Sequence, residues 1–334
     1  MSAPPAEVAR GFGRANAVAD RGLIAVANVF LEVRLGKQIA PATITPVINS
    51  IISSMQNNPL VFNGLMQFRR DSEQVYRHAL ATSALMIALG RNLHLGQMDL
   101  HAAGLAGLLL DSGVNLLPAG ADGNKVDPYR LPADMWQKHV PLGHDFIVRS
   151  NLAENVARAC LEHHERFDAN GWPNQTGGHA LSKLGRMAAI CDAYDLLASD
   201  SDTRSGLNPV EALHRMKADH GAYDPEILAV FETTIGLWPT GSVVELRSGR
   251  WAVVIKQNPE VYDQPLIAVF FVPASAQRIS DVWIDLATCY GADAIAGAAA
   301  IDSLPDDLRD IAAAGLSDAL ARVMPTRKVP ARAL

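Results

Sequence analysis

The sequence predicts a mostly α-helical protein that carries a small β-module near its carboxyl end. Over most of the chain before residue 237, apolar residues recur at the three- and four-residue spacing of a helix face. After Leu237-Trp238-Pro239 the pattern changes to short runs of β-branched and aromatic residues, which are typical of strands. The 334 residues, 49% of them hydrophobic, are enough for a large core and a second, smaller unit.

Residues 1–70 are predicted to form a helical amino-terminal region. Residues 1–19 hold two adjacent prolines and many alanines, so we expect a frayed start there. Helical spacing then continues from Ile24 to about Arg70, and Pro46 suits the first turn of a helix within this stretch.

Residues 71–236 are predicted to form the main helical domain. Apolar spacing predicts helices over four ranges, namely 74–94, 99–110, 134–147 and 153–165. Ser182 is a suitable cap for a further helix that runs to Ala198, and the next helix begins at Pro209. Residues 118–132 and 168–178 are rich in turn formers and are predicted to be loops.

Residues 237–290 are predicted to form the β-module. Residues 243–246 and 251–255 alternate as two strands around a tight turn at Arg247-Ser248-Gly249-Arg250, and residues 265–272 form a further strand. Residues 291–334 form the last region, with a helix over residues 305–324 and a loose basic tail.

Charge and cysteine content narrow the functional classes. The net charge of −6 argues against a general DNA- or RNA-binding surface. Three cysteines without a Cys-x-x-Cys pair indicate reduced thiols, as in a cytoplasm. The apolar run Leu23–Leu31 is too short to span a bilayer. The expectation is therefore a cytoplasmic protein that binds neither DNA nor a membrane.

The clearest candidates for a functional site are His163-His164-Glu165, followed by Asp192. Adjacent histidines on a helix point about 100° apart, so they can line two sides of one cavity. Alone, this triplet fits an ordinary surface helix better than a metal site. We interpret the six histidines outside the motifs as ordinary surface or core residues: His94, His101, His144, His179, His214 and His220.

Asp111 adds to this pattern. It follows the apolar run AAGLAGLLL, so its carboxylate starts from a poorly hydrated position and needs a partner. That partner is either a cation or the backbone of the turn at Ser112-Gly113, and the residues alone leave both interpretations open.

The segment from about residue 70 to residue 231 resembles the HD-GYP family, a branch of the HD superfamily of metal-dependent phosphohydrolases. His78 matches the first family histidine, and Leu110–Val114 stands where the family has HD-x-G-K. His139–Gly143 matches H-x-x-x-G, and His163–Pro173 matches HHE followed by DGxGYP. Arg186–Leu197 matches the motif R-I-x-x-I-x-D-x-[FY]-D-A-L.

The resemblance implies a five-helix HD core around a divalent metal site. Donors without thiolate favour iron, manganese or cobalt over a structural zinc, with iron or manganese the first choice and one or two ions bound. The implied metal ligands are His78, Asp111, His139, His163, His164 and Asp192, with Asp111 as the bridging, catalytic carboxylate. The implied substrate contacts are Arg186, Arg204, Gly171, Trp172 and Pro173, although either arginine is equally suited to a plain surface ion pair.

Four departures from the family pattern lie at this site. Leu110 replaces the histidine of the HD pair and cannot bind a metal, and Val114 replaces a lysine expected near the phosphate. Gln74 stands where relatives with a third metal often have glutamate, and Trp172 replaces the tyrosine of GYP. One ion position is therefore expected to be weakened, and the other to keep its ligands.

Two main functions remain open on this basis. The first is a cyclic di-GMP phosphodiesterase of weak activity that forms pGpG or GMP. The second is an inactive module that binds a nucleotide, or a signalling protein through the Gly171-Trp172-Pro173 loop. Hydrolysis of a different nucleotide is a third reading. The amino-terminal helices are candidates for homodimer formation by their position only.

Overall fold

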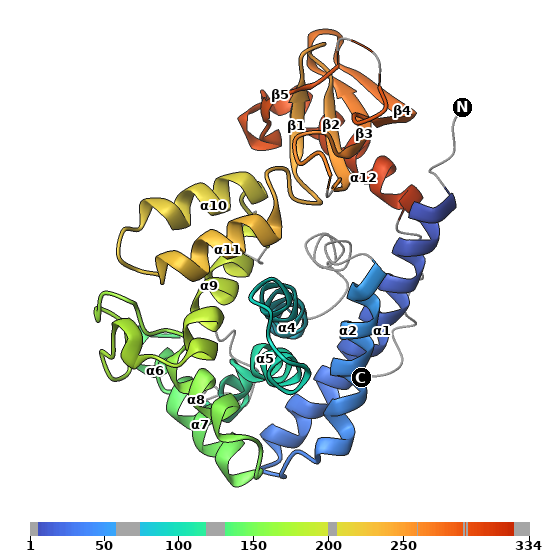
Figure 1. Cartoon of the computed structure of the whole chain (residues 1–334). Coiled ribbons are helices and arrows are strands. Elements are labelled where there is room, and N and C mark those ends of the chain that lie inside the picture. Colours follow the sequence, from blue (N-terminus) through green and yellow to red (C-terminus); the bar gives the residue numbers. More distant parts are fainter. Residues whose placement is uncertain are drawn as a thin grey trace.

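The computed structural model describes residues 6–57, 74–117, 131–199, 206–258, 260–289, 291 and 293–323. Two long helices, α4 (Gln74–Asn92) and α5 (Gln97–Leu109), lie at the centre of the molecule (Figure 1). Helices α1 and α2 lie on one side of this pair, and α7, α8 and α9 lie on the other. The arrangement is the mostly helical fold that the sequence predicts.

The amino-terminal helices form an antiparallel pair, α1 (Ala6–Arg34) and α2 (Pro41–Asn57). The predicted frayed start is wrong from residue 6 onward, because Ala15 and Ala19 are buried and extend the apolar face of α1. Packing of such a face stabilises a helix more than local propensity does. Pro46 lies inside α2 and not in its first turn, since the helix already begins at Pro41.

The central helices are almost entirely buried. All but four residues of α4 belong to the buried core, and α5 is buried from Ala102 to Leu109. Ser83 of α4 donates its hydroxyl hydrogen to the carbonyl oxygen of Gly104 in α5 at 2.7 Å. Both helices therefore provide a rigid base for the polar residues at their ends.

The next helices surround that base. They are α6 (Ala133–Trp136), α7 (His139–Arg149), α8 (Glu154–Glu162) and α9 (Lys183–Ala198). The helix predicted over residues 134–147 is thus broken in two after Trp136. Ser182 caps α9 as predicted, since its hydroxyl oxygen accepts a hydrogen bond from the backbone amide of Gly185. The predicted loop at residues 118–132 lies mostly outside the described residues.

Two further helices connect this core to the sheet. Each begins with a proline after a capping side chain: α10 (Pro209–Ala218) follows Asn208, and α11 (Pro225–Ile235) follows Asp224. The side-chain amide of Asn208 also donates to the carbonyl oxygens of Val243 and Ala299, so it joins α10 to the sheet.

The carboxyl-terminal sheet is antiparallel, with the strand order β4-β3-β2-β1-β5. Its strands are β1 (Val243–Leu246), β2 (Trp251–Lys256), β3 (Leu266–Val272), β4 (Gln277–Asp285) and β5 (Ile295–Ala298). The predicted hairpin and third strand are confirmed. The sheet extends past residue 290, because the short glycine- and alanine-rich β5 pairs with β1. The division of the chain into four regions stays a prediction.

Helix α12 (Asp306–Val323) packs against β3 and β4 and contacts α1, as Figure 1 shows. Within the described residues, no helix combines the length and the apolar character that crossing a membrane requires.

Candidate metal centre

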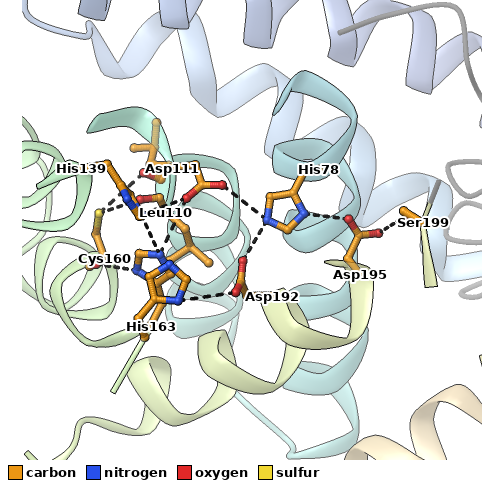
Figure 2. Close-up of polar contacts among 11 residues, drawn as sticks. His78, Leu110, Asp111, His139, Cys160, His163, Asp192, Asp195 and Ser199 are labelled. Carbon is orange, nitrogen blue, oxygen red and sulfur yellow. Dashed lines mark hydrogen bonds and ion pairs between the residues drawn. The ribbon is translucent and has the colours of Figure 1, made fainter. Parts of the chain in front are cut away.

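The six predicted metal ligands converge from different elements, and Figure 2 labels five of them. His78 comes from α4, Asp111 follows α5, and His139 begins α7. His163 and His164 follow α8, and Asp192 lies in α9. Five of the six side chains are buried and His164 is half-buried. Residues separated by more than a hundred positions in the chain therefore share one polar centre inside an apolar core.

The donors fall into two groups whose ligand atoms lie within 4.8 Å of one another. The four-donor group contains Asp111, His139, His163 and His164. The three-donor group contains His78, Asp111 and Asp192. Asp111 is the member common to both groups. A carboxylate in that position is able to bridge two ions, because each of its oxygens is available to one side.

Distances around Asp111 follow this division. Its Oδ1 lies 3.3 Å from Nε2 of His139 and 3.8 Å from Nε2 of His163. Its Oδ2 lies 3.5 Å from Nε2 of His78, on the other side. Across the centre, Nδ1 of His164 lies 4.0 Å from Oδ2 of Asp192. The two groups are thus in direct contact.

Three of the histidines are oriented by hydrogen bonds from their second ring nitrogen. Nδ1 of His139 donates to the carbonyl oxygen of Trp136 at 2.6 Å, and Nδ1 of His163 donates to that of Cys160 at 2.7 Å. Nδ1 of His78 lies 2.7 Å from Oδ2 of Asp195. These contacts direct each Nε2 toward the centre, which is how proteins commonly fix metal-binding histidines.

Local packing explains the close approach of Asp111 and His139. Gly113 lies in the 3-10 helix η1 (Ser112–Leu116), against the backbone of α7. A Cβ atom at Gly113 would lie 1.9 Å from the carbonyl oxygen of His139. Only glycine therefore lets the segment after Asp111 reach α7.

Leu110 stands beside this centre with 1% of its surface exposed (Figure 2). It closes α5 and contributes its side chain to the hydrophobic core. The neighbouring Cys160 thiol donates to the carbonyl oxygen of Leu110 at 3.1 Å. Burial and the nearby Asp111 carboxylate raise the pKa of that thiol, and within the described residues Cys160 joins neither donor group.

The carboxylates and imidazoles of the centre shift one another's pKa values. Burial would lower the pKa of His78, but its contacts with Asp192 and Asp195 outweigh it and raise that pKa. Burial would also lower the pKa of His163, but the contact of His163 with Asp111 outweighs it and raises that pKa.

Burial alone would raise the pKa of the Asp111 carboxyl, but the adjacent imidazoles of His139 and His163 outweigh it and hold that pKa well below its usual range. Burial lowers the pKa of His164 well below its usual value, and the neighbouring His163 and His139 add to this effect. His164 is therefore neutral at neutral pH, as a metal ligand must be.

Two buried atoms of the four-donor group, Oδ1 of Asp111 and Nε2 of His164, have no hydrogen bond of good geometry within the described residues, although Oδ1 of Asp111 lies 3.3 Å from Nε2 of His139. Unsatisfied buried polar atoms are costly, and a divalent cation between these donors would give the Asp111 oxygen a partner. Imidazole and carboxylate donors suit a transition metal. The residues present therefore fit a metal ion on the four-donor side.

The Gly171-Trp172-Pro173 loop lies against this side. A Cβ atom at Gly171 would lie 2.3 Å from the amide nitrogen of Arg166, so the loop can pass there only with glycine. The Glu165 carboxylate accepts hydrogen bonds from the backbone amides of Asn174 and Thr176. The Trp172 ring stacks on His164 with centroids 4.2 Å apart.

Of the two predicted phosphate-binding arginines, the structure describes Arg186. Arg186 forms an ion pair with the buried carboxylate of Asp224, and its Nη1 lies 3.2 Å from Nδ1 of His179. Its guanidinium thus connects α9 to the capping residue of α11. Arg204 lies outside the described residues.

Sequence reasoning missed the residues that support the ligands. Asp195 contacts His78, and its other oxygen accepts a hydrogen bond from the Ser199 hydroxyl at 2.9 Å. Asp195 is part of the matched motif, and its spacing of three residues from Asp192 places both on one face of α9. Nothing in the sequence pairs Asp224 with Arg186. Within the described part of the chain, the six histidines considered ordinary join neither donor group.

Comparisons with known proteins agree with this geometry. A family model described as an HD domain matches residues 62–227. A cyclic di-GMP phosphodiesterase of Pseudomonas aeruginosa is 33% identical over 281 residues, which cover 83% of this chain and 67% of that protein. A cyclic di-GMP phosphodiesterase response regulator of Xanthomonas campestris is 24% identical over 166 residues, which cover 48% of this chain and 43% of that protein.

Among solved structures, a protein described as HDG"Y"P from Bdellovibrio bacteriovorus matches with a TM-score of 0.55 and 17% identity. The match covers 67% of this chain and 72% of that one. At this identity the likeness concerns the fold alone.

Proposed function

The chain belongs to the HD-GYP branch of the HD domain family, and from this premise we propose that it is a metal-dependent phosphodiesterase of reduced activity. Its proposed substrate is cyclic di-GMP, and its products are pGpG or GMP. The observation that carries the proposal is the convergence of five imidazole and carboxylate donors on a sixth, Asp111, in a buried centre.

Iron or manganese is the proposed metal, because the donor set combines nitrogen and oxygen atoms without a thiolate. When bound, such an ion polarises a phosphate oxygen and activates water for attack on phosphorus. Asp111 is common to both donor groups, and together with His139, His163 and His164 it would hold the ion on the four-donor side. We propose the Gly171-Trp172-Pro173 loop as a boundary of the substrate site.

Reduced activity follows from two substitutions. Leu110 leaves the other side with three donors, so a second ion would bind weakly there. Val114 supplies no positive charge near the phosphate, and one preorganised electrostatic group of this kind is worth about a hundredfold in rate. Arg186 and Arg204 remain the proposed phosphate contacts, and Arg186 would have to use the part of its guanidinium that does not face Asp224.

The direct test is hydrolysis of cyclic di-GMP by the purified chain with added manganese or ferrous iron. We expect slow, metal-dependent formation of pGpG or GMP. Asp111→Asn is the matched inactive control, because it keeps the size of the side chain and removes the shared charge. Turnover that is equal in both proteins would contradict the proposal.

A second candidate is an inactive module that binds nucleotide or a signalling protein. Two observations favour it, Leu110 in place of a ligand and the pairing of Arg186 with Asp224. Equilibrium binding of cyclic di-GMP without any product, at saturating metal, would support this alternative. Turnover of another cyclic dinucleotide, and not of cyclic di-GMP, would instead move the proposal to a different substrate. We also propose the amino-terminal helices as a homodimer interface. The mass of the protein in solution tests this.

A further inference from the structure

Two tryptophan rings lie against two histidines of the four-donor group. The Trp172 ring stacks on His164, with centroids 4.2 Å apart and planes 26° apart. The Trp136 ring lies 4.3 Å from the ring of His139, with planes 43° apart. Trp172 also meets His139 edge to face at 5.8 Å. Indole rings thus cover part of the surface of this group.

The histidines of the four-donor group are not anchored in the same way. His139 and His163 each donate Nδ1 to a backbone carbonyl three residues earlier. His164 has no such bond, since its Nδ1 lies 4.0 Å from the nearest carboxylate oxygen of Asp192 and its Nε2 has no hydrogen-bond partner within the described residues. Its closest ring contacts are with Trp172 and His163.

Trp172 is itself held firmly. Its backbone amide donates to the carbonyl oxygen of His164 at 3.2 Å, so the ring and its target are joined at the backbone. Gly171 packs on the backbone of Glu165 and Arg166, and the Glu165 carboxylate fixes the following residues of the loop. The indole is therefore placed over His164 by contacts that do not involve the metal or a substrate.

We propose that Trp172 is the positioning residue of His164, and that stacking of the indole replaces the carbonyl bond that orients the other two histidines. The inference rests on the proposed metal centre, and it does not require hydrolysis. It gives the tryptophan a role in addition to any substrate contact, because one face of the indole is occupied by His164. A ring whose orientation is fixed in advance loses less freedom when it binds a metal.

The test is the dissociation constant for manganese or cobalt in Trp172→Leu and Trp172→Phe, measured by competition with a chelator. An aromatic pair predicts a loss of about two- to tenfold in metal affinity for the leucine variant. The phenylalanine variant keeps a stacking ring and should lose less. Trp238→Phe, in the segment before the sheet, is the matched control and should bind metal like the unchanged protein.

A double-mutant cycle separates positioning from simple space filling. If Trp172 acts through His164, then Trp172→Leu in a His164→Gln background should cause no further loss of metal affinity. Additive losses, or a leucine variant with unchanged metal affinity, would overturn the inference. If the leucine variant does not fold, the cycle is performed with Trp172→Phe. Additive losses of metal affinity would again overturn the inference.

If the proposed metal centre itself is wrong, the binding measurements would give a different result. In that case the unchanged protein would bind neither manganese nor cobalt, whatever residue stands at position 172. A fluorescence measurement gives an independent readout, because cobalt quenches nearby indoles. The cobalt-dependent quenching should fall in Trp172→Phe and persist in Trp238→Phe. Equal quenching in both variants would contradict the placement of Trp172 beside the ion.

Discussion

The two sides of the metal centre differ in how many donors remain and in how those donors are supported. The four-donor group holds three imidazoles around Asp111, whereas the three-donor group holds His78 and Asp192 with Leu110 nearby. All four donors of the first group are brought together in the structure although Leu110 stands beside the centre. An apolar residue at position 110 is therefore compatible with a fold that still gathers these donors.

The supports of the two sides also differ. On the four-donor side, His139 and His163 are oriented by carbonyl oxygens three residues earlier in their own segments. On the other side, His78 of α4 depends on Asp195 of α9, 117 positions away. Its Nε2 also contacts Asp192 at 2.8 Å. The three-donor side therefore depends on the packing of α4 against α9.

Removal of the shared carboxylate should have the largest effect on metal binding. Asp111→Asn deletes the only charged ligand of the four-donor group and disturbs both sides at once. We expect metal affinity to fall by more than about a hundredfold, since loss of a ligand exceeds the cost of losing an outer contact. Metal content after gel filtration measures this. Retention of the ion by this variant would mean that the two sides do not share Asp111.

The same histidine-to-glutamine substitution should reduce metal affinity by different amounts on the two sides. His163→Gln removes a ligand of the four-donor group, so we expect a loss of tight metal binding of at least about tenfold. His78→Gln removes a ligand of the side that Leu110 has already weakened, and the same ion should be held within about threefold of its original affinity. Titration with manganese compares the two. Equal losses would show that the sides are not independent.

The close contact of Gly113 with α7 can be tested by a substitution whose main effect is on folding stability. Gly113→Ala places a methyl group 1.9 Å from the carbonyl oxygen of His139, so α7 must move. We expect the free energy of unfolding to fall by about 1–3 kcal/mol, and metal affinity to fall with it. Gly96→Ala is the control, because a Cβ there meets nothing within 4 Å. Equal stability of the two variants would contradict the close contact of Gly113 with α7.

The smallest expected effect is on the free energy of unfolding, and it comes from the ion pair of Asp219 with Arg166, next to the Gly171-Trp172-Pro173 loop. This effect should depend on pH. Asp219 accepts two hydrogen bonds from Arg166, which lower the pKa of its carboxyl. Because the folded pKa is depressed, the stabilisation is present above about pH 4 and is lost as pH falls through the folded value.

In Asp219→Asn we therefore expect a loss of about 0.5 kcal/mol or less at pH 7, since the pair is exposed to solvent. Chemical unfolding at several pH values measures it. The difference from the unchanged protein should vanish in acid, and a difference that grows in acid would have the wrong sign.

Sequence reasoning succeeded where the signal is local. Apolar spacing placed most helices, and the ordered motifs named six donors that the structure brings together. It failed where the deciding contact is distant or the pattern is weak. Strand β5 is short and rich in glycine and alanine, so only its pairing with β1 defines it. The Asp195–His78 and Asp224–Arg186 contacts join separate helices, and no spacing rule reaches across them.

We infer that Leu110 removes one ion position and leaves the other. The most direct measurement is the number of metal ions per chain in the unchanged protein and in Leu110→His, each loaded with iron or manganese and then freed of loosely bound ions. We expect one tightly bound ion in the unchanged protein and a second in Leu110→His, with faster hydrolysis of cyclic di-GMP when Val114→Lys is added. Two tightly bound ions and rapid turnover in the unchanged protein would contradict it, because another residue would then have taken the place of the missing histidine.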